Sequence, residues 1–218
     1  MKPSFHFSFF FFLLSLLPFT FYFLPCPLFA QNRADALLEY RNGNFERAVE
    51  ICKNEIAVNS TNMDSHVVIS WSLVSLGRYT EAMDYAQAAR SINRYDVRIT
   101  EILGEICYYQ GRNNEALQYF QDYINMAPEG ARIEAVYYFL GEIFIRLGWF
   151  RHADIALTTA VHRVPGNAAW WTRLAYAREN AGDFHEAAIA YETALSLNSQ
   201  LNDAQRGLER VRQALAQL

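Results

Sequence analysis

Glycine recurs along this 218-residue chain at an almost constant interval. The intervals are 34, 34, 37 and 34 residues, and the glycines that set them are Gly43, Gly77, Gly111, Gly148 and Gly182. Around the last glycine, residues 168–199 contain two runs with apolar side chains at i, i+3, i+4 and i+7 spacing. This pattern predicts two helices joined by a tight turn. Its repetition constrains the chain to an array of similar hairpins, with no single globular core.

Small residues recur at a fixed offset from these glycines. An alanine follows each glycine after five residues: Ala48, Ala82, Ala116, Ala153 and Ala187. A period of 34 residues with small residues at fixed positions resembles the tetratricopeptide repeat, and the resemblance covers everything after about residue 30. It implies an all-α, right-handed superhelical solenoid of five helix hairpins. In this family the first helices of the hairpins line a concave groove in which ligands usually bind.

The repeat register divides the chain into an N-terminal hydrophobic segment, five repeats and a last helix. Their ranges are 1–30 for the segment, about 31–62, 63–96, 97–133, 134–167 and 168–199 for the repeats, and 200–218 for the last helix. Three additional residues, 131–133, account for the spacing of 37 and extend the connection or the start of the next helix. The last helix has one apolar and one charged side, so we expect it to cap the array; dimerisation is the alternative. Asp183 and Glu186 have the spacing of a capping box.

Residues 3–30 contain no Asp, Glu, Lys or Arg and consist mainly of Phe and Leu. Three interpretations fit: a cleaved secretory signal, an uncleaved membrane anchor, or a lipoprotein signal with lipidation at Cys26. All three predict an exported protein, periplasmic or membrane-associated. The remaining cysteines, Cys52 and Cys107, lie in different repeats, so we expect two separate buried thiols and no disulfide.

Charge and motifs favour a binding scaffold over an enzyme. The net charge is −4, and it becomes −5 without residues 1–30, whose one charged side chain is Lys2. An acidic chain is a poor match for nucleic acid. The five histidines show no metal-ligand spacing, and no phosphate-binding glycine loop or nucleophile elbow is present. We therefore expect no catalysis, metal or cofactor.

The register also predicts a binding groove with an aromatic lining and acidic spots. Its candidate residues are Trp71, Glu101, Glu105, Tyr108, Tyr109, Tyr138, Glu142 and Tyr176. Such a lining suits a partner peptide with apolar anchors and a Lys or Arg. An open, wet groove predicts carboxylates with ordinary pKa values. The alternatives are that the aromatics pack between repeats and that the glutamates form only a solvated face. For function, the alternatives are a small apolar-ligand-binding component of an envelope transport system and a self-assembling structural protein.

Overall fold

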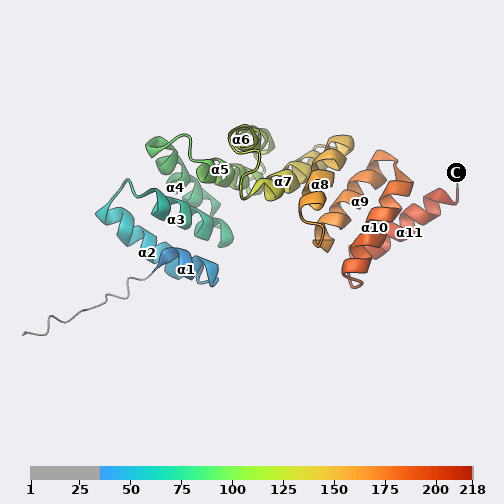
Figure 1. Cartoon of the computed structure of the whole chain (residues 1–218), viewed down its shortest axis with the longest axis horizontal. Coiled ribbons are helices and arrows are strands. Elements are labelled where there is room, and N and C mark those ends of the chain that lie inside the picture. Colours follow the sequence, from blue (N-terminus) through green and yellow to red (C-terminus); the bar gives the residue numbers. More distant parts are fainter. Residues whose placement is uncertain (1–34, 218) are drawn as a thin grey trace, which may run out of the picture. The chain divides into compact units, whose positions relative to one another are not determined.

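The computed structural model describes residues 35–217, which form helices and no strands within that range (Figure 1). The predicted export segment and the start of the first repeat lie outside the described residues. The helices are α1 (Ala36–Arg41), α2 (Phe45–Val58), α3 (Met63–Ser75), α4 (Tyr79–Ile92), α5 (Val97–Tyr109), α6 (Asn113–Met126), α7 (Ile133–Arg146), α8 (Phe150–Arg163), α9 (Ala168–Ala181), α10 (Phe184–Leu197) and α11 (Asn202–Leu215). The first ten pair into five hairpins, which confirms the predicted fold class.

Each hairpin turns at one of the periodic glycines. Their φ angles lie between 72° and 85°, in the left-handed region that side chains with a Cβ avoid. The glycines therefore recur at a regular interval because five equivalent turns each require a positive φ. None of the described helices combines the length and the apolar character needed to cross a bilayer.

The two helices of a hairpin approach closely where a small residue meets a large one. A Cβ added to Gly104 on α5 would lie 2.5 Å from the ring of Phe120 on α6. Gly141 on α7 faces Leu157 on α8 in the same manner. Gly104 and Gly141 are 37 residues apart, at equivalent positions of the third and fourth repeats, and each lets the helix backbone approach a large side chain, as close helix packing requires.

The buried apolar side chains form two clusters along the array. One extends from α1 to α8, and the other from α8 to α11. Cys52 and Cys107 are both buried and unbonded, which confirms the prediction of separate thiols. Helix α11 covers α10 with Leu208 and Val211, and its Gly207 packs against the ring of Tyr191. The last helix therefore covers the apolar face of the fifth hairpin.

The three additional residues change the connection between the third and fourth hairpins. Four residues join α4 to α5 and α8 to α9, whereas six join α6 to α7, and α7 is one residue longer than α5. An Asn or Asp side chain caps the first helices α3, α5 and α9, but the residue before α7 is Arg132, which makes no cap hydrogen bond. At the start of α7, the position that an Asn or Asp cap occupies in α3, α5 and α9 is therefore occupied by the cationic Arg132.

The predicted capping box at the start of α10 is wrong. The Asp183 side chain accepts no hydrogen bond from the helix amides. It instead pairs with Arg151 on α8, with an Nη1 to Oδ2 distance of 2.8 Å. The residues before all five second helices have ψ between 58° and 65°, and none makes a side-chain cap hydrogen bond, so the missing cap is a feature of this turn in every hairpin.

Candidate binding groove and its arginine–carboxylate pairs

The eight predicted groove residues all lie on first helices. Trp71 is on α3; Glu101, Glu105, Tyr108 and Tyr109 are on α5; Tyr138 and Glu142 are on α7; and Tyr176 is on α9. These helices contact one another in that order along the array. The register therefore brings the residues onto consecutive elements, although the side chains differ strongly in exposure.

The predicted acidic spots are covered by arginines of this chain. Glu101 is fully buried, and Glu105 and Glu142 are nearly so. Arg132 Nη2 lies 3.0 Å from Glu101 Oε1 and 2.6 Å from Glu105 Oε1. Arg173 on α9 holds Glu142 with two hydrogen bonds, from Nε and Nη2 to the two carboxylate oxygens. The carboxylates face inward, so they form neither a solvated face nor a docking site for a cationic side chain.

The expectation of ordinary pKa values is wrong for Glu105. Burial and the charge of Glu101 raise the pKa of Glu105 well above its usual range, and Arg132 opposes this rise only in part. Glu101 Oε2 is buried and has no hydrogen-bond partner among the described residues. Both glutamates are buried and contact Arg132 of the inserted connection, so the expectation of an open groove fails at this part of α5.

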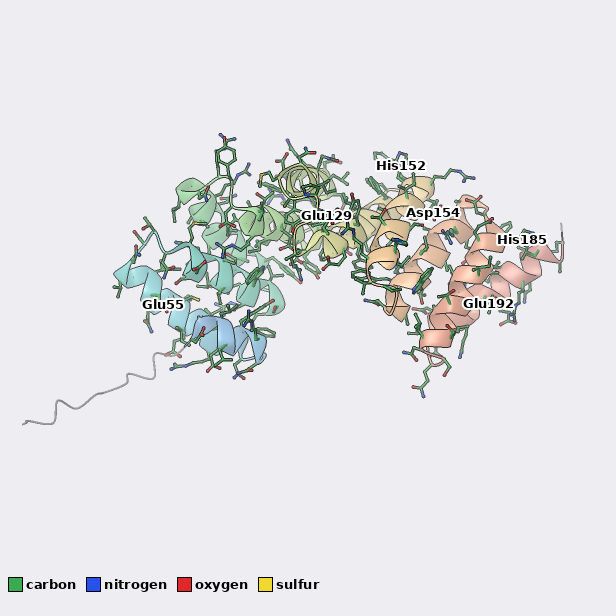
Figure 2. All side chains as sticks on the ribbon, viewed as in Figure 1. Glu55, Glu129, His152, Asp154, His185 and Glu192 are labelled. Carbon is green, nitrogen blue, oxygen red and sulfur yellow. The ribbon has the colours of Figure 1, made fainter. Side chains whose placement is uncertain are left out.

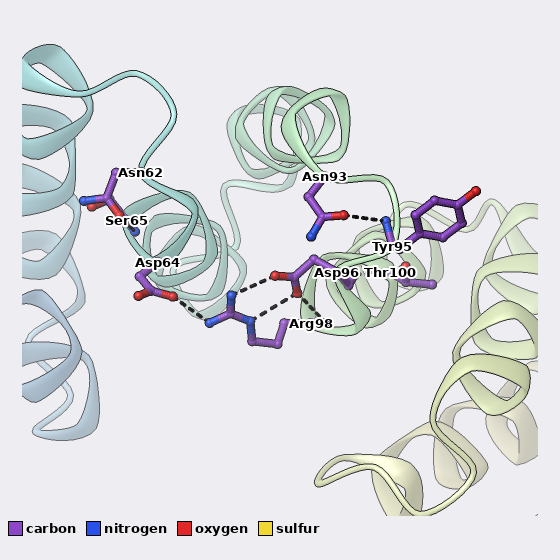
Figure 3. A network of polar contacts seen from close by, with 8 residues as sticks. All are labelled: Asn62, Asp64, Ser65, Asn93, Tyr95, Asp96, Arg98 and Thr100. Carbon is purple, nitrogen blue, oxygen red and sulfur yellow. Dashed lines mark hydrogen bonds and ion pairs between the residues drawn. The ribbon is translucent and has the colours of Figure 1, made fainter.

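Similar pairs join other neighbouring first helices. Arg98 on α5 donates to Asp64 on α3 at 2.8 Å and to the capping carboxylate of Asp96 at 2.7 Å (Figure 3). At the other end, Arg210 on α11 holds Glu179 on α9 with Nε and Nη2 at 2.6 and 2.8 Å. We refer to these contacts, with Arg132–Glu101 and Arg173–Glu142, as the arginine–carboxylate pairs. They fix the guanidinium orientation from one repeat to the next.

The aromatic candidates mostly stack on neighbours. Trp71 stacks on Tyr40, with ring centroids 5.7 Å apart, and Tyr138 stacks on Trp170 at 4.9 Å. The Arg146 guanidinium lies 3.7 Å from the centroid of the buried Tyr108 ring. Burial raises the pKa of Tyr138 to about 12. These rings hold adjacent repeats together, as the packing alternative proposed.

Two of the predicted tyrosines keep accessible surface. Tyr109 is 45% exposed at the end of α5, with one ring face stacked on Tyr79. Tyr176 is partly exposed and lines a cavity of about 390 Å³ near α11. The accessible surface of the first helices thus includes tyrosine rings, the partly exposed paired arginines and the exposed carboxylate of Asp64.

The site offers no arrangement for metal chemistry in residues 35–217. No group of three or more His, Cys, Asp or Glu side chains in this range could hold a metal ion. His152 on α8 and His185 on α10 lie on different hairpins (Figure 2), and both are exposed.

Sequence reasoning missed Arg132 and Arg210 as residues of this surface. Three of the pairs share one signal, a glutamate followed by an arginine after 31 residues: Glu101 and Arg132, Glu142 and Arg173, Glu179 and Arg210. This spacing is three residues shorter than the repeat. For Glu142 and Glu179 it places the arginine one helical turn back, on α9 and α11 respectively, whereas Arg132 reaches Glu101 from the connection before α7, where the repeat spacing is 37.

Comparison with known proteins agrees with this architecture. A family model described as the tetratricopeptide repeat matches residues 33–97, 69–131 and 138–202. No curated protein sequence is similar enough to match.

Several solved structures are similar in fold. A chain of the APC/C hetero-tetramer Cut9-Hcn1 aligns with a TM-score of 0.73 and 17% identity, over 81% of this chain and 35% of that one, so this chain spans about a third of it. Pseudomonas aeruginosa pilF aligns with a TM-score of 0.73 and 15% identity, over 83% and 81% of the two chains. YrrB, described as a TPR protein with an unusual peptide-binding site, aligns with a TM-score of 0.64 and 16% identity, over 80% and 88%.

Proposed function

Because this chain belongs to the tetratricopeptide-repeat family, we propose that it is a noncatalytic scaffold whose first helices hold a peptide segment of a partner protein. The observation that carries this proposal is the accessible surface on the first helices α5 and α9. Tyr109 and Tyr176 supply rigid aromatic contact area, and the paired arginines supply oriented donors. Peptide binding by YrrB, which has the same fold, is consistent with this role.

The arginine–carboxylate pairs revise the chemistry expected of the partner. Glu101, Glu105 and Glu142 are already neutralised from within, so a Lys or Arg of the partner would have to displace an intramolecular arginine. The accessible groups near these glutamates include tyrosine rings and guanidinium edges. A segment with apolar or aromatic anchors therefore fits without breaking an existing pair.

Site-specific photocrosslinking in cells tests the proposal. A benzophenone-bearing phenylalanine is placed at Tyr176 on α9, and the matched control carries it at Ile155, which is 69% exposed on the second helix of the fourth hairpin. We expect partner adducts from position 176 and none from position 155. Adducts from Ile155 alone would overturn binding at the first helices.

We also propose that the scaffold acts outside the cytoplasm. The proposal rests on the charge-free apolar stretch at 3–30, which has the composition of an export or anchoring segment. N-terminal sequencing and intact mass of the cellular protein distinguish a cleaved, lipidated or retained segment. Full-length, unmodified protein confined to the cytoplasmic fraction would contradict it.

A further inference from the structure

The turn of the fourth hairpin carries an exposed tryptophan that the fold does not require. Trp149 follows Gly148 and is 51% exposed. The equivalent residues of all five turns share one backbone conformation, with φ between −91° and −81° and ψ between 58° and 65°. At the other four turns these residues are polar: Asn44, Arg78, Arg112 and Asp183. The turn therefore forms without an aromatic ring at this position.

The polar equivalents have partners within the array, and Trp149 does not. The side chain at each of the four polar positions makes a hydrogen bond to another residue of this chain. The indole N–H of Trp149 has no partner among residues 35–217. A large exposed ring with a free donor, at a position where the fold needs neither, indicates contact with something outside the chain.

Packing orients the Trp149 ring and leaves about half of the residue accessible. The ring stacks on Phe144 with centroids 6.0 Å apart, and the His152 ring lies 5.8 Å away. Figure 2 shows His152 at the outer edge of this hairpin. The hollow beside the ring has a volume of about 430 Å³, and its lining consists of five consecutive residues, 148–152. Because one turn supplies all of this lining, no second element forms the opposite wall that a buried protein anchor needs.

Cationic side chains flank the ring. The Arg151 side chain is 71% exposed, and it pairs with Asp183. Arg146, three residues before Trp149, contacts the ring and the carbonyl of Tyr108 and has no carboxylate partner among residues 35–217. Tryptophan is enriched at the boundary between water and lipid, and guanidinium groups bind phosphate oxygens. The tip therefore has the chemistry of a contact with phospholipid headgroups.

The sequence gives a reason for a membrane to be near this tip. Residues 3–30 are apolar and carry no charge, and only residues 31–34 separate them from the described array. Four residues span at most about 14 Å. A membrane that holds this segment therefore stays close to the first hairpin.

We propose that the turn around Trp149 contacts the headgroup region of the membrane that holds residues 3–30, and so orients the array on the bilayer. Tethering makes such a small contact effective, because a tethered tip meets lipid at a high effective concentration. This inference rests on the proposed location outside the cytoplasm. It uses a surface separate from the first helices, since Trp149 precedes α8.

Quenching of tryptophan fluorescence by brominated lipid tests the contact. The full chain, residues 1–218, is reconstituted into vesicles of phosphatidylcholine and phosphatidylglycerol whose acyl chains carry bromine near the headgroup. Trp149 is one of four tryptophans, so we expect brominated vesicles to remove up to about a quarter of the emission.

Two conservative variants provide the matched comparison. Trp149→Phe removes the reporter at the tip, whereas Trp71→Phe removes a tryptophan that stacks on Tyr40 within the array. We expect the quenching to disappear in Trp149→Phe and to persist in Trp71→Phe. Quenching that is absent from the unchanged protein, or that persists in Trp149→Phe, overturns the membrane contact. Peptide binding and the location outside the cytoplasm survive that result, because neither depends on this turn.

Photocrosslinking in cells distinguishes lipid from a protein partner at the same tip. A benzophenone-bearing phenylalanine at position 149 should give lipid adducts, which intact mass identifies by their small mass increase. Protein adducts without lipid adducts, or no adducts at all, overturn the proposal.

Discussion

Removing Arg132 should destabilise the array in a pH-dependent manner. In Arg132→Ala, the fully buried Glu101 and the neighbouring Glu105 lose their cation. Breaking a buried ion pair from one side costs about 3–5 kcal/mol. The Arg132 side chain is 46% exposed, so water screens part of this effect, and we expect a loss of about 2 kcal/mol at pH 8.

The sign of the pH dependence follows from the raised pKa of Glu105. Below the ordinary carboxyl pKa, Glu105 binds a proton in both the folded and the unfolded state, so its protonation costs no stability there. As pH rises toward the folded pKa, the unfolded state loses its proton first, and stability falls. Loss of Arg132 raises the folded pKa further, so the variant should lose more stability between pH 5 and pH 8 than the unchanged protein.

Urea unfolding followed by circular dichroism at pH 5 and pH 8 measures this difference. Arg163→Ala is the control, because Arg163 pairs with the exposed Glu129 and should show no added pH dependence. Changing Glu101 and Glu105 to Gln in the Arg132→Ala background should restore stability at pH 8. A loss in Arg132→Ala that is equal at the two pH values would refute the reasoning.

Three further predictions concern the hairpins. Gly104→Ala should cost about 1–3 kcal/mol through overpacking against Phe120, whereas Gly166→Ala, with no atom within 4 Å of its added Cβ, should change the urea midpoint little. Asn113→Phe should stabilise the protein by about 1 kcal/mol, because the Asn113 Oδ1 atom is buried with no partner among the described residues. The other four second helices begin with Phe or Tyr, so an aromatic ring fits this position. Thermal melting checks this prediction, and a lower melting temperature would count against it. Burial raises the pKa of the Cys52 thiol to about 12 and that of Cys107 in the same direction, so iodoacetamide at pH 8 should label both only in urea; peptide mass spectrometry that finds them labelled in the native protein would disprove it.

Local pattern was sufficient to predict the hairpins because each turn and each close approach is decided within one repeat. Gly182 needs a positive φ, and Gly104 needs space beside Phe120; both demands appear in the sequence as small residues at fixed positions. The same local reasoning failed at Asp183. The spacing of Asp183 and Glu186 matches a capping box, but the turn before each of the five second helices holds its last residue in a conformation without a side-chain cap, and Asp183 pairs with Arg151.

Predicting which groove residues are accessible required knowing which side chains pair between neighbouring repeats, and alignment at the 34-residue period does not show these pairs. Glu142 and Arg173 are 31 residues apart, so aligning repeats at 34 places them at different positions of successive first helices. Tyr138 and Trp170 stack across the same junction, which is why an aromatic stripe in the sequence became packing surface. Residue type predicted which helix faces carry aromatic and acidic side chains, but contacts with the neighbouring helix determined which of those side chains remained accessible.

The inserted connection between α6 and α7 shows how one contact between repeats changes which charged groups are accessible on the first helices. At the other connections an Asn or Asp caps the next first helix, whereas here Arg132 occupies that position and extends to Glu101 and Glu105. One change of residue at a cap thus covers two carboxylates and leaves guanidinium surface outside. Arg173 and Arg210 cover Glu142 and Glu179 in the same way, so these glutamates are less accessible to a ligand than the arginines that pair with them. For an array of this kind, ligand chemistry follows from the pairing between repeats and not from the composition of any one of them.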